Sequence, residues 1–134
     1  MPADYTYDNA GDVEELREGP LFYSVSVGNC WRSTWSDQKG RFIYKRKVFL
    51  RVSWCARGGL ITYWSPETWP EVGDLCGVTW GPAATREGGG VGSSSVTVKS
   101  RAVFTCRFGF GIPDQTSDVD VDVKFKADGS REDV

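Results

Sequence analysis

Apolar and polar residues alternate with a period of two along most of this chain, and this pattern restricts the fold more than any other feature. Successive side chains of an extended strand point to opposite faces, so the period indicates strands with one buried and one solvated face. Within 41–55, Phe42, Val48 and Trp54 fall on one face, whereas Lys47 and Arg51 fall on the other. The pattern predicts strands in segments 20–28, 41–55, 60–64, 76–80, 96–110 and 117–126.

Five or six strands with almost no helical periodicity indicate an all-β fold. We predict an antiparallel β-sandwich, with a small barrel as the alternative. Residues 56–59, ARGG, predict the turn of a hairpin. Segment 65–75 contains two prolines and a glycine and segment 81–95 is rich in glycine, so both are expected to be loops.

The length of 134 residues fits one domain with one core. Residues 1–19 carry six acidic residues and a single arginine, and they contain few large aliphatic side chains. We therefore expect an extended acidic N-terminal arm over 1–19, in which only 12–18 could form a short helix. A β-sandwich domain over 20–127 and a polar tail over 128–134 complete the predicted organisation.

Four cysteines, Cys30, Cys55, Cys76 and Cys106, stand without a CxxC spacing and without any histidine in the chain. This arrangement favours two disulfides over four buried thiols or a metal site made of four thiolates. Four cysteines allow three pairings, and we favour Cys30 with Cys55 and Cys76 with Cys106 because local pairing is simplest.

The expected compartment follows from the cysteines, because disulfides persist mainly outside the cytosol. No apolar stretch is long enough to cross a bilayer, so no membrane anchor is expected. The N-terminus lacks the basic and apolar regions of a signal peptide. We therefore expect a mature secreted chain that carries an added start methionine.

The run SDVDVDVKFK, residues 117–126, places three aspartates two residues apart. It resembles the start of a calcium loop, but Val123 and Gly129 occupy the positions where such a loop needs glycine and glutamate. We interpret the run as a strand with its carboxylates facing solvent, opposite a basic row of Lys45, Lys47 and Arg51. A calcium site completed by Asp114 is the alternative, and we expect no metal and no cofactor.

The absence of histidine removes the commonest general base and the catalytic triads that depend on it. The remaining enzyme hypothesis is a small glycoside hydrolase that uses Glu67 and Glu71, which flank Trp69. Two acids in a short polar segment are more often solvated loop residues. We therefore expect no catalytic residues and no enzyme activity.

Trp31, Trp35, Trp64 and Trp69 are expected at strand ends or in loops, whereas Trp54 is expected in the core. Loop tryptophans could form a sugar-stacking platform or the anchors of a protein interface, or they could cap the core. Nucleic acid is not an expected partner, because the isoelectric point near 5.1 is far below the range of such binders.

The pieces CW at 30–31, VSWCARGG at 52–59 and AVFTCRFGFG at 102–111 together resemble small secreted proteins of actinobacteria. The resemblance covers roughly residues 28–112. It implies an exported β-domain that contains disulfides, and it implies no catalytic residue, because many of those proteins are uncharacterised.

We expect a secreted, non-enzymatic protein-interaction module, acting as a subunit or adaptor of an extracellular assembly. The predicted partner contacts are the loop tryptophans Trp31, Trp35, Trp64 and Trp69 and the acidic residues of the arm, Asp4, Asp8, Asp12, Glu14, Glu15 and Glu18. A carbohydrate-binding domain that uses the same tryptophans is the main alternative.

Overall fold

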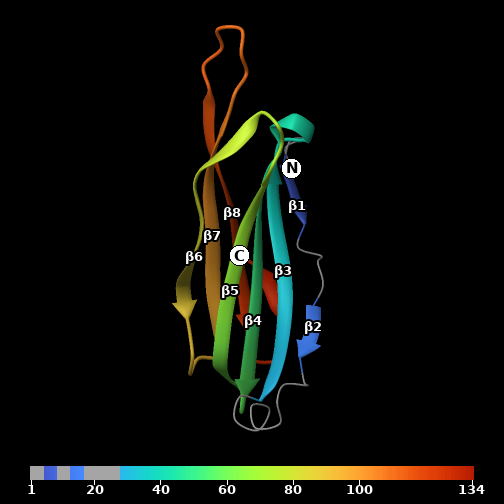
Figure 1. The fold of residues 1–134 in the computed structure, drawn as a ribbon. Coiled ribbons are helices and arrows are strands. Elements are labelled where there is room, and N and C mark those ends of the chain that lie inside the picture. The colour runs from blue at the N-terminus through green and yellow to red at the C-terminus, as the bar shows by residue number, and fades with distance from the viewer. Residues whose placement is uncertain (1–4, 9–12, 17–27) are drawn as a thin grey trace.

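The computed structural model describes residues 5–8, 13–16 and 28–134, and these form two antiparallel sheets packed face to face (Figure 1). The first sheet contains β1 (Tyr5–Asp8), β2 (Val13–Leu16), β3 (Asn29–Lys39), β4 (Arg46–Arg57) and β5 (Leu60–Val72). The second contains β6 (Cys76–Gly89), β7 (Ser95–Cys106), β8 (Gln115–Lys126) and β9 (Arg131–Asp133). A 3-10 turn, η1 (Phe42–Tyr44), precedes β4. The predicted sandwich is confirmed, and these strands do not close into a barrel.

The strand order in the first sheet is β1-β3-β4-β5, with β2 pairing along the same edge of β3 as β1. The order in the second sheet is β6-β7-β8-β9. Every pairing is antiparallel between the described strands, and β3–β4–β5 and β6–β7–β8 are each successive hairpins. Among the described strands, only the connection between β5 and β6 passes from one sheet to the other (Figure 1).

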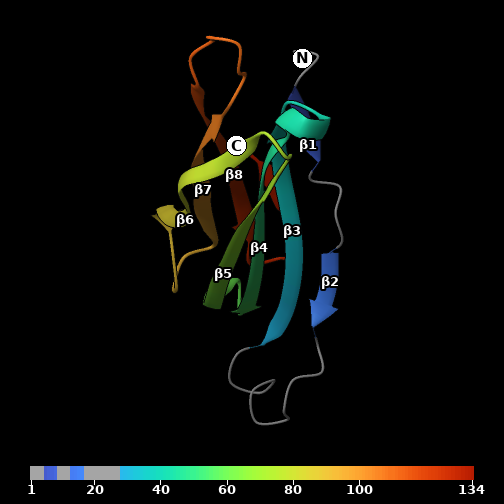
Figure 2. The same cartoon turned by 45° about the horizontal axis from the view of Figure 1, so that its top comes forward.

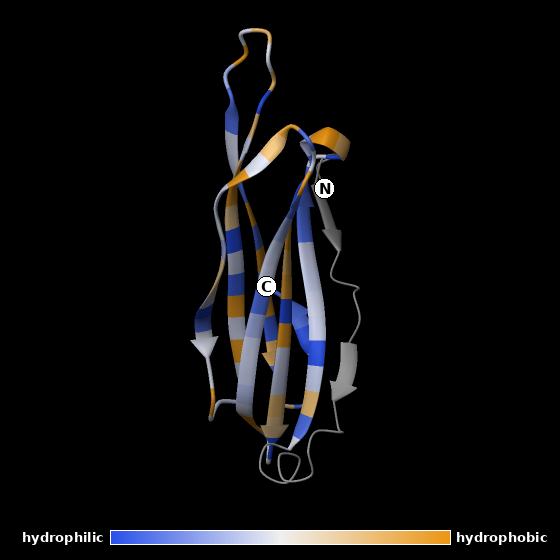
Figure 3. Cartoon of the chain, in the orientation of Figure 1, coloured by the Kyte–Doolittle hydropathy of each residue, from blue (hydrophilic) through white to orange (hydrophobic). Residues whose placement is uncertain are grey.

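The core lies between the inward faces of the two sheets, as the two-residue period predicts. Figure 3 shows the resulting alternation of hydrophobic and hydrophilic bands along β7. The first sheet contributes Trp35, Val48, Leu50, Val52, Trp54 and Ile61. The second contributes Val96, Val98, Ala102, Phe104, Val119, Val121, Val123 and Phe125.

Trp54 is the central side chain of this core. Its ring centroid lies 5.8 Å from that of Trp31, 6.5 Å from that of Trp35 and 5.1 Å from that of Phe125. Its Nε1 donates a hydrogen bond of 2.9 Å to the carbonyl oxygen of Lys126 on β8. Because a buried indole N–H needs an acceptor, this bond joins the two sheets while satisfying the only polar atom of the side chain.

Both segments that we expected to be loops lie largely in strands. β5 continues to Val72 and β6 continues to Gly89. Each is an edge strand, and Pro66 and Pro70 pair only with β4, so the missing N–H groups of these prolines leave no central ladder broken. β6 accommodates its irregular sequence through register shifts at Val78/Trp80, Trp80/Ala83 and Arg86/Gly88.

The N-terminal segments are strands rather than the helix that the sequence allowed. Backbone pairing places Val13–Leu16 opposite Cys30–Ser33 of β3, and a four-residue helix could not compensate for the loss of these bonds. The strand predicted over 20–28 falls, except for Gly28, outside the described residues. Asp4, Asp12 and Glu18 of the predicted arm lie outside them as well.

Two disulfides, Cys30–Cys55 and Cys76–Cys106, confirm the predicted pairing. Each joins residues that lie directly opposite each other on neighbouring strands, β3 with β4 and β6 with β7. The chain direction puts them at opposite ends of the sandwich (Figure 1). No free cysteine remains.

Replacing both Cys76 and Cys106 by alanine should lower the free energy of unfolding by about 3.5 kcal/mol, because the disulfide restricts the unfolded chain. Urea unfolding of the unreduced proteins measures the difference. The Cys30/Cys55 double variant is the matched control and should lose a similar amount, since the sequence separations are 30 and 25 residues. An unchanged urea midpoint in both variants would show that the disulfides do not contribute this stability.

Candidate functional site

Three of the four tryptophans proposed as contacts face the core. Trp35 on β3 is 0% exposed, so its ring cannot contact a partner of the folded chain. Trp31 on β3 packs on Trp54, and Trp64 on β5 lies with its ring centroid 6.1 Å from that of Phe125. These side chains lie within strands and pack on the core, which matches the core-capping alternative. Trp31 and Trp35 share the parity of buried Ser33 on β3, and Trp64 follows the bulge at Cys55/Ala56 and pairs with buried Trp54.

Trp69 alone of the four lies on the outer face of the first sheet. Its ring stacks on that of Phe49, its cross-strand partner on β4, with centroids 5.2 Å apart and an interplanar angle of 11°. The Arg51 guanidinium lies 5.2 Å from the Trp69 centroid, and Lys47 Nζ lies 4.7 Å from that of Phe49. Neighbouring side chains therefore cover much of the Trp69 ring, which leaves little of its face for a sugar.

Glu67 and Glu71 do not have the geometry of a glycosidase pair. They lie four residues apart on β5, which corresponds to about 13 Å, whereas such pairs stand roughly 5–10 Å apart. Glu71 forms an ion pair with Lys45, and the hydrogen bond from Lys45 lowers the pKa of Glu71. A catalytic acid needs the opposite shift.

The aspartate run forms β8, with its carboxylates on the outer face as predicted. Their basic partners, however, are on β7: Arg101 Nε lies 3.1 Å from Asp118 Oδ2, and Lys99 Nζ lies 3.8 Å from Asp120 Oδ2. The predicted partner row of Lys45, Lys47 and Arg51 belongs to the other half of the sandwich, with Lys47 and Arg51 on β4. Over the described residues, no group of three or more potential metal ligands comes together.

Asp122 differs from the other two aspartates because it meets a second carboxyl group. The register shift between Arg86 and Gly88 in β6 brings Glu87 against it. Oδ1 of Asp122 is buried and receives no hydrogen bond from a donor in the described part of the chain. Burial and the Glu87 carboxyl together raise the pKa of Asp122 to about 6, with Lys99 opposing the shift.

Exposed apolar side chains lie on two segments at one end of the sandwich, η1 and the β7–β8 loop. We call Phe42, Ile43, Phe110 and Ile112 the apolar end. Phe42 is 87% exposed and Phe110 fully exposed, and Figures 1 and 2 both show the β7–β8 loop projecting beyond the sheets. Their signal in the sequence is weak, although Phe110 stands between two glycines in FGFGI.

Backbone bonds and one ring pair connect the segments of the apolar end. The amide of Leu75 donates to the carbonyl of Ile43 at 2.9 Å, and the amide of Arg107 donates to the carbonyl of Leu75 at 2.8 Å. The rings of Tyr44 and Phe108 stack with centroids 5.1 Å apart. Gly73 permits this approach, because a Cβ there would overlap the carbonyl oxygen of Phe42.

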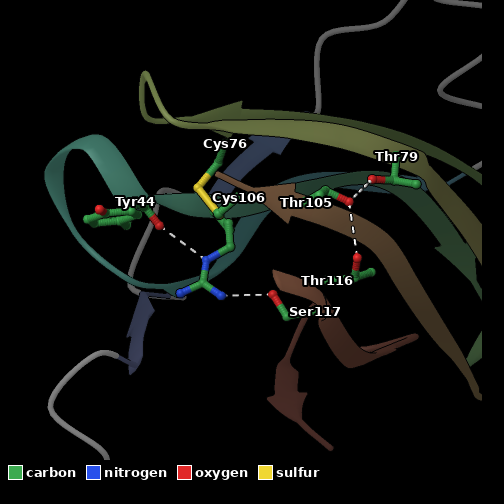
Figure 4. Close-up of a disulfide and its surroundings, with 8 residues drawn as sticks. Tyr44, Cys76, Thr79, Thr105, Cys106, Thr116 and Ser117 are labelled. Atoms are coloured by element: carbon green, nitrogen blue, oxygen red, sulfur yellow. Dashed lines mark hydrogen bonds between the residues drawn. A yellow bond between two sulfur atoms is a disulfide. The ribbon is translucent and has the colours of Figure 1, made fainter. Parts of the chain in front are cut away.

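Trp80 on β6 is a surface residue that the sequence did not single out. The residue is 52% exposed, and it pairs with Val103 on the outer face of the second sheet. Nearby, the hydroxyls of Thr79, Thr105 and Thr116 form a row, which Figure 4 shows beside the Cys76–Cys106 disulfide. A Trp followed by Gly-Pro marks a break in a strand, and this was the available signal.

Comparisons with known proteins add no assignment to these surfaces. No family model matches the chain, and neither a curated protein nor a solved structure is detectably similar to it. Within the described residues, no helix has the length and apolar character needed to cross a membrane.

Asp122→Asn should stabilise the fold at pH 7. The native pKa of about 6 lies above the usual 3.8, so the native state holds more protons than the unfolded state between these values. Stability from this group is therefore present below about pH 4 and is lost as the pH rises through 6. The variant should gain about 1 kcal/mol at pH 7, a value reduced for solvent screening, and should lose part of this pH dependence.

Urea unfolding at pH 4, 5, 6 and 7 measures this effect. Glu67→Gln, which removes an exposed carboxylate from the other sheet, is the control and should leave the difference between pH 4 and pH 7 unchanged. If Asp122→Asn unfolds with the same pH dependence as the parent, then Asp122 does not carry the raised pKa.

Proposed function

We propose that this protein is a secreted, non-enzymatic protein-interaction module and that the apolar end is its contact surface. The observation that carries this proposal is the exposure of Phe42 and Phe110 on two connected segments at one end of a rigid sandwich. Exposed apolar groups of this size are unfavourable in water and mark sites where a partner binds. Two disulfides support an extracellular location, because such bonds persist in oxidising compartments.

The surroundings of the apolar end favour a protein over a lipid surface. Charged side chains of both signs surround it, with Arg41 and Arg107 as cations and Asp74 and Asp114 as anions, all of them exposed. An apolar centre with a polar rim of mixed charge is the usual anatomy of a protein interface. An anionic membrane would instead favour a rim that is mainly basic.

Both exposed phenylalanines stand at turns with an uncommon backbone conformation, and each turn contains a backbone hydrogen bond, Lys45 N–H to Phe42 O and Ile112 N–H to Gly109 O. Phe42 and Phe110 have φ values of +56° and +52°, a region that non-glycine residues seldom adopt. Residues held in such conformations concentrate at functional sites. A surface ordered in advance loses less conformational entropy on binding, which favours affinity.

The N-terminal arm has a weaker claim to partner binding than the apolar end. Asp8 lies in β1 and Glu14 and Glu15 lie in β2, and the backbone of these strands already pairs with β3 of the same chain. The carbohydrate hypothesis based on Trp31, Trp35, Trp64 and Trp69 has little support, because three of these rings face the core. Catalysis by Glu67 and Glu71 is disfavoured by their separation.

The double variant Phe42→Ser/Phe110→Ser should lose its protein partner. The full chain, immobilised, is exposed to the secreted and surface proteins of the source organism, and any captured protein is purified and titrated against each variant. Loss of two aromatic anchors should weaken binding by at least about 30-fold. Leu60→Ser is the matched control, because Leu60 is also exposed but lies at the other end of the sandwich.

Three results would contradict the proposal. Equal binding by the double variant would place the contact elsewhere, and the absence of any stoichiometric protein partner would remove the function. Binding to phosphatidylglycerol vesicles that depends on Phe42 and Phe110 would replace the protein partner by a lipid surface.

A further inference from the structure

We propose that the outer face of the second sheet around Trp80 binds a carbohydrate. This site lies on a sheet face that adjoins the apolar end, and it does not depend on the function proposed for that end. It consists of Trp80, the hydroxyl row of Thr79, Thr105 and Thr116, and the ion pair between Arg101 and Asp118.

Trp80 is 52% exposed, and in the described part of the chain the one cation over its ring is the Arg101 guanidinium, 6.0 Å from the centroid. Its pairing partners in the outer layer are Val103 on β7 and, beyond it, Asp118 on β8. On β7, the outward residues on either side of Val103 are Thr105 and Arg101. Their partners on β6 are Gly77 and Ala83, which are too small to cover an indole. Space around Gly77 is empty, since a Cβ built there meets no atom within 4 Å. Trp69, in contrast, has Phe49 stacked on its ring.

Two sets of polar groups stand on either side of this indole along β7. Val103, the partner of Trp80, is two residues from Thr105 in one direction and two residues from Arg101 in the other, about 7 Å each way. Thr105 Oγ1 lies 2.5 Å from Thr79 Oγ1 and 3.2 Å from Thr116 Oγ1. On the other side, the Arg101 guanidinium lies 6.0 Å from the Trp80 ring centroid and 3.1 Å from Asp118 Oδ2.

A sugar ring requires this combination of groups. Its C–H face packs on an aromatic ring, while its hydroxyls, each both donor and acceptor, need fixed polar partners around the rim. The threonine hydroxyls can donate or accept, Arg101 donates and Asp118 accepts. The hydrogen bond from Arg101 lowers the pKa of Asp118, which keeps this carboxylate ionised as an acceptor. The pair also holds both side chains in fixed positions before a ligand arrives.

The surroundings favour a carbohydrate over other partners. The outward residues on either side of Val103 along β7 are Thr105 and Arg101, a hydroxyl and a charge, whereas the core of a protein interface is largely apolar. Asp118 and Asp120 on the neighbouring strand disfavour the phosphates of a nucleic acid. The extended sheet face suits a linear polysaccharide that lies along it.

The test is retention of the full chain on insoluble cellulose, chitin and xylan, together with titration of cellohexaose, chitohexaose and xylohexaose. Trp80→Ala should weaken binding to the retained polysaccharide by at least about tenfold. Thr105→Val, which replaces a hydroxyl by a methyl group of similar size, should weaken it severalfold. Trp69→Ala is the matched control and should bind like the parent, because it removes a tryptophan from the opposite outer face. Urea midpoints establish that each variant is folded.

The outcomes separate this site from the apolar end. Phe42→Ser/Phe110→Ser should retain full polysaccharide binding, and Trp80→Ala should retain the protein partner. The proposal is overturned if none of the three polysaccharides or their hexasaccharides binds, or if Trp80→Ala binds them as the parent does. It is also overturned if Trp80→Ala loses a protein partner instead, since the face would then be a protein interface.

Discussion

The burial of Trp54 between the two sheets is the interaction on which the rest of the structure depends. Its ring contacts Trp31 and Trp35 from the same sheet and Phe125 from the other, and its N–H bonds the Lys126 carbonyl across the core. A non-directional apolar contact would allow one sheet to slide over the other, whereas a directional hydrogen bond fixes their relative position. A second inter-sheet bond, 2.5 Å between Thr68 Oγ1 and buried Ser100 Oγ, acts in the same way.

Because side chains alternate along each strand, the residues that face the core determine which residues lie on the outer face of each sheet. On the first sheet the aromatic rings of Phe49 and Trp69 stack on each other and interact with the cations of Lys47 and Arg51, so the surface is largely self-satisfied. On the second sheet, two ion pairs join β7 to β8 and two join β8 to β9. Trp80, in contrast, lies on the edge strand β6, where the residues that pair with Thr105 and Arg101 are the small Gly77 and Ala83. Trp69 is therefore covered by its neighbours and Trp80 is more exposed, because β6 contains register shifts and the small residue Gly77 beside Trp80.

The fold was largely predictable because its main determinant is local. Alternation identifies strands and their buried side without knowledge of neighbours, and the nearest cysteines in sequence are joined when hairpins follow one another. Segments 65–72 and 81–89 were mispredicted because proline and glycine, which exclude a segment from the centre of a sheet, are tolerated at its edges. Whether an edge is available depends on strand order, which no local pattern encodes.

The candidate sites were much less predictable, for the same reason. Asp118 and Asp120 of β8 lie on the outer face as expected, whereas Asp122 is partly buried against Glu87 of β6. The partners of these acids depend on which strand lies beside them. Trp35 and Trp69 belong to similar polar contexts in the sequence, and only their parity relative to the core separates a buried ring from a surface ring. Phe42 and Phe110 are exposed because they lie in turns outside the paired strands, and composition carries no information about that position.

The Cys76–Cys106 disulfide connects the two proposed surfaces. Leu75, which precedes Cys76, bonds both η1 and Arg107 at the apolar end, whereas Thr105, which precedes Cys106, belongs to the hydroxyl row beside Trp80 (Figure 4). One covalent bond therefore anchors the start of an irregular edge strand at the point where both surfaces begin. Since β6 has three register shifts and pairs on one side only, its pairing alone would hold Trp80 and the β5–β6 connection loosely. The position of this disulfide therefore matters more than its contribution to global stability. It allows the edge strand β6 to support both the apolar end and the outer face around Trp80.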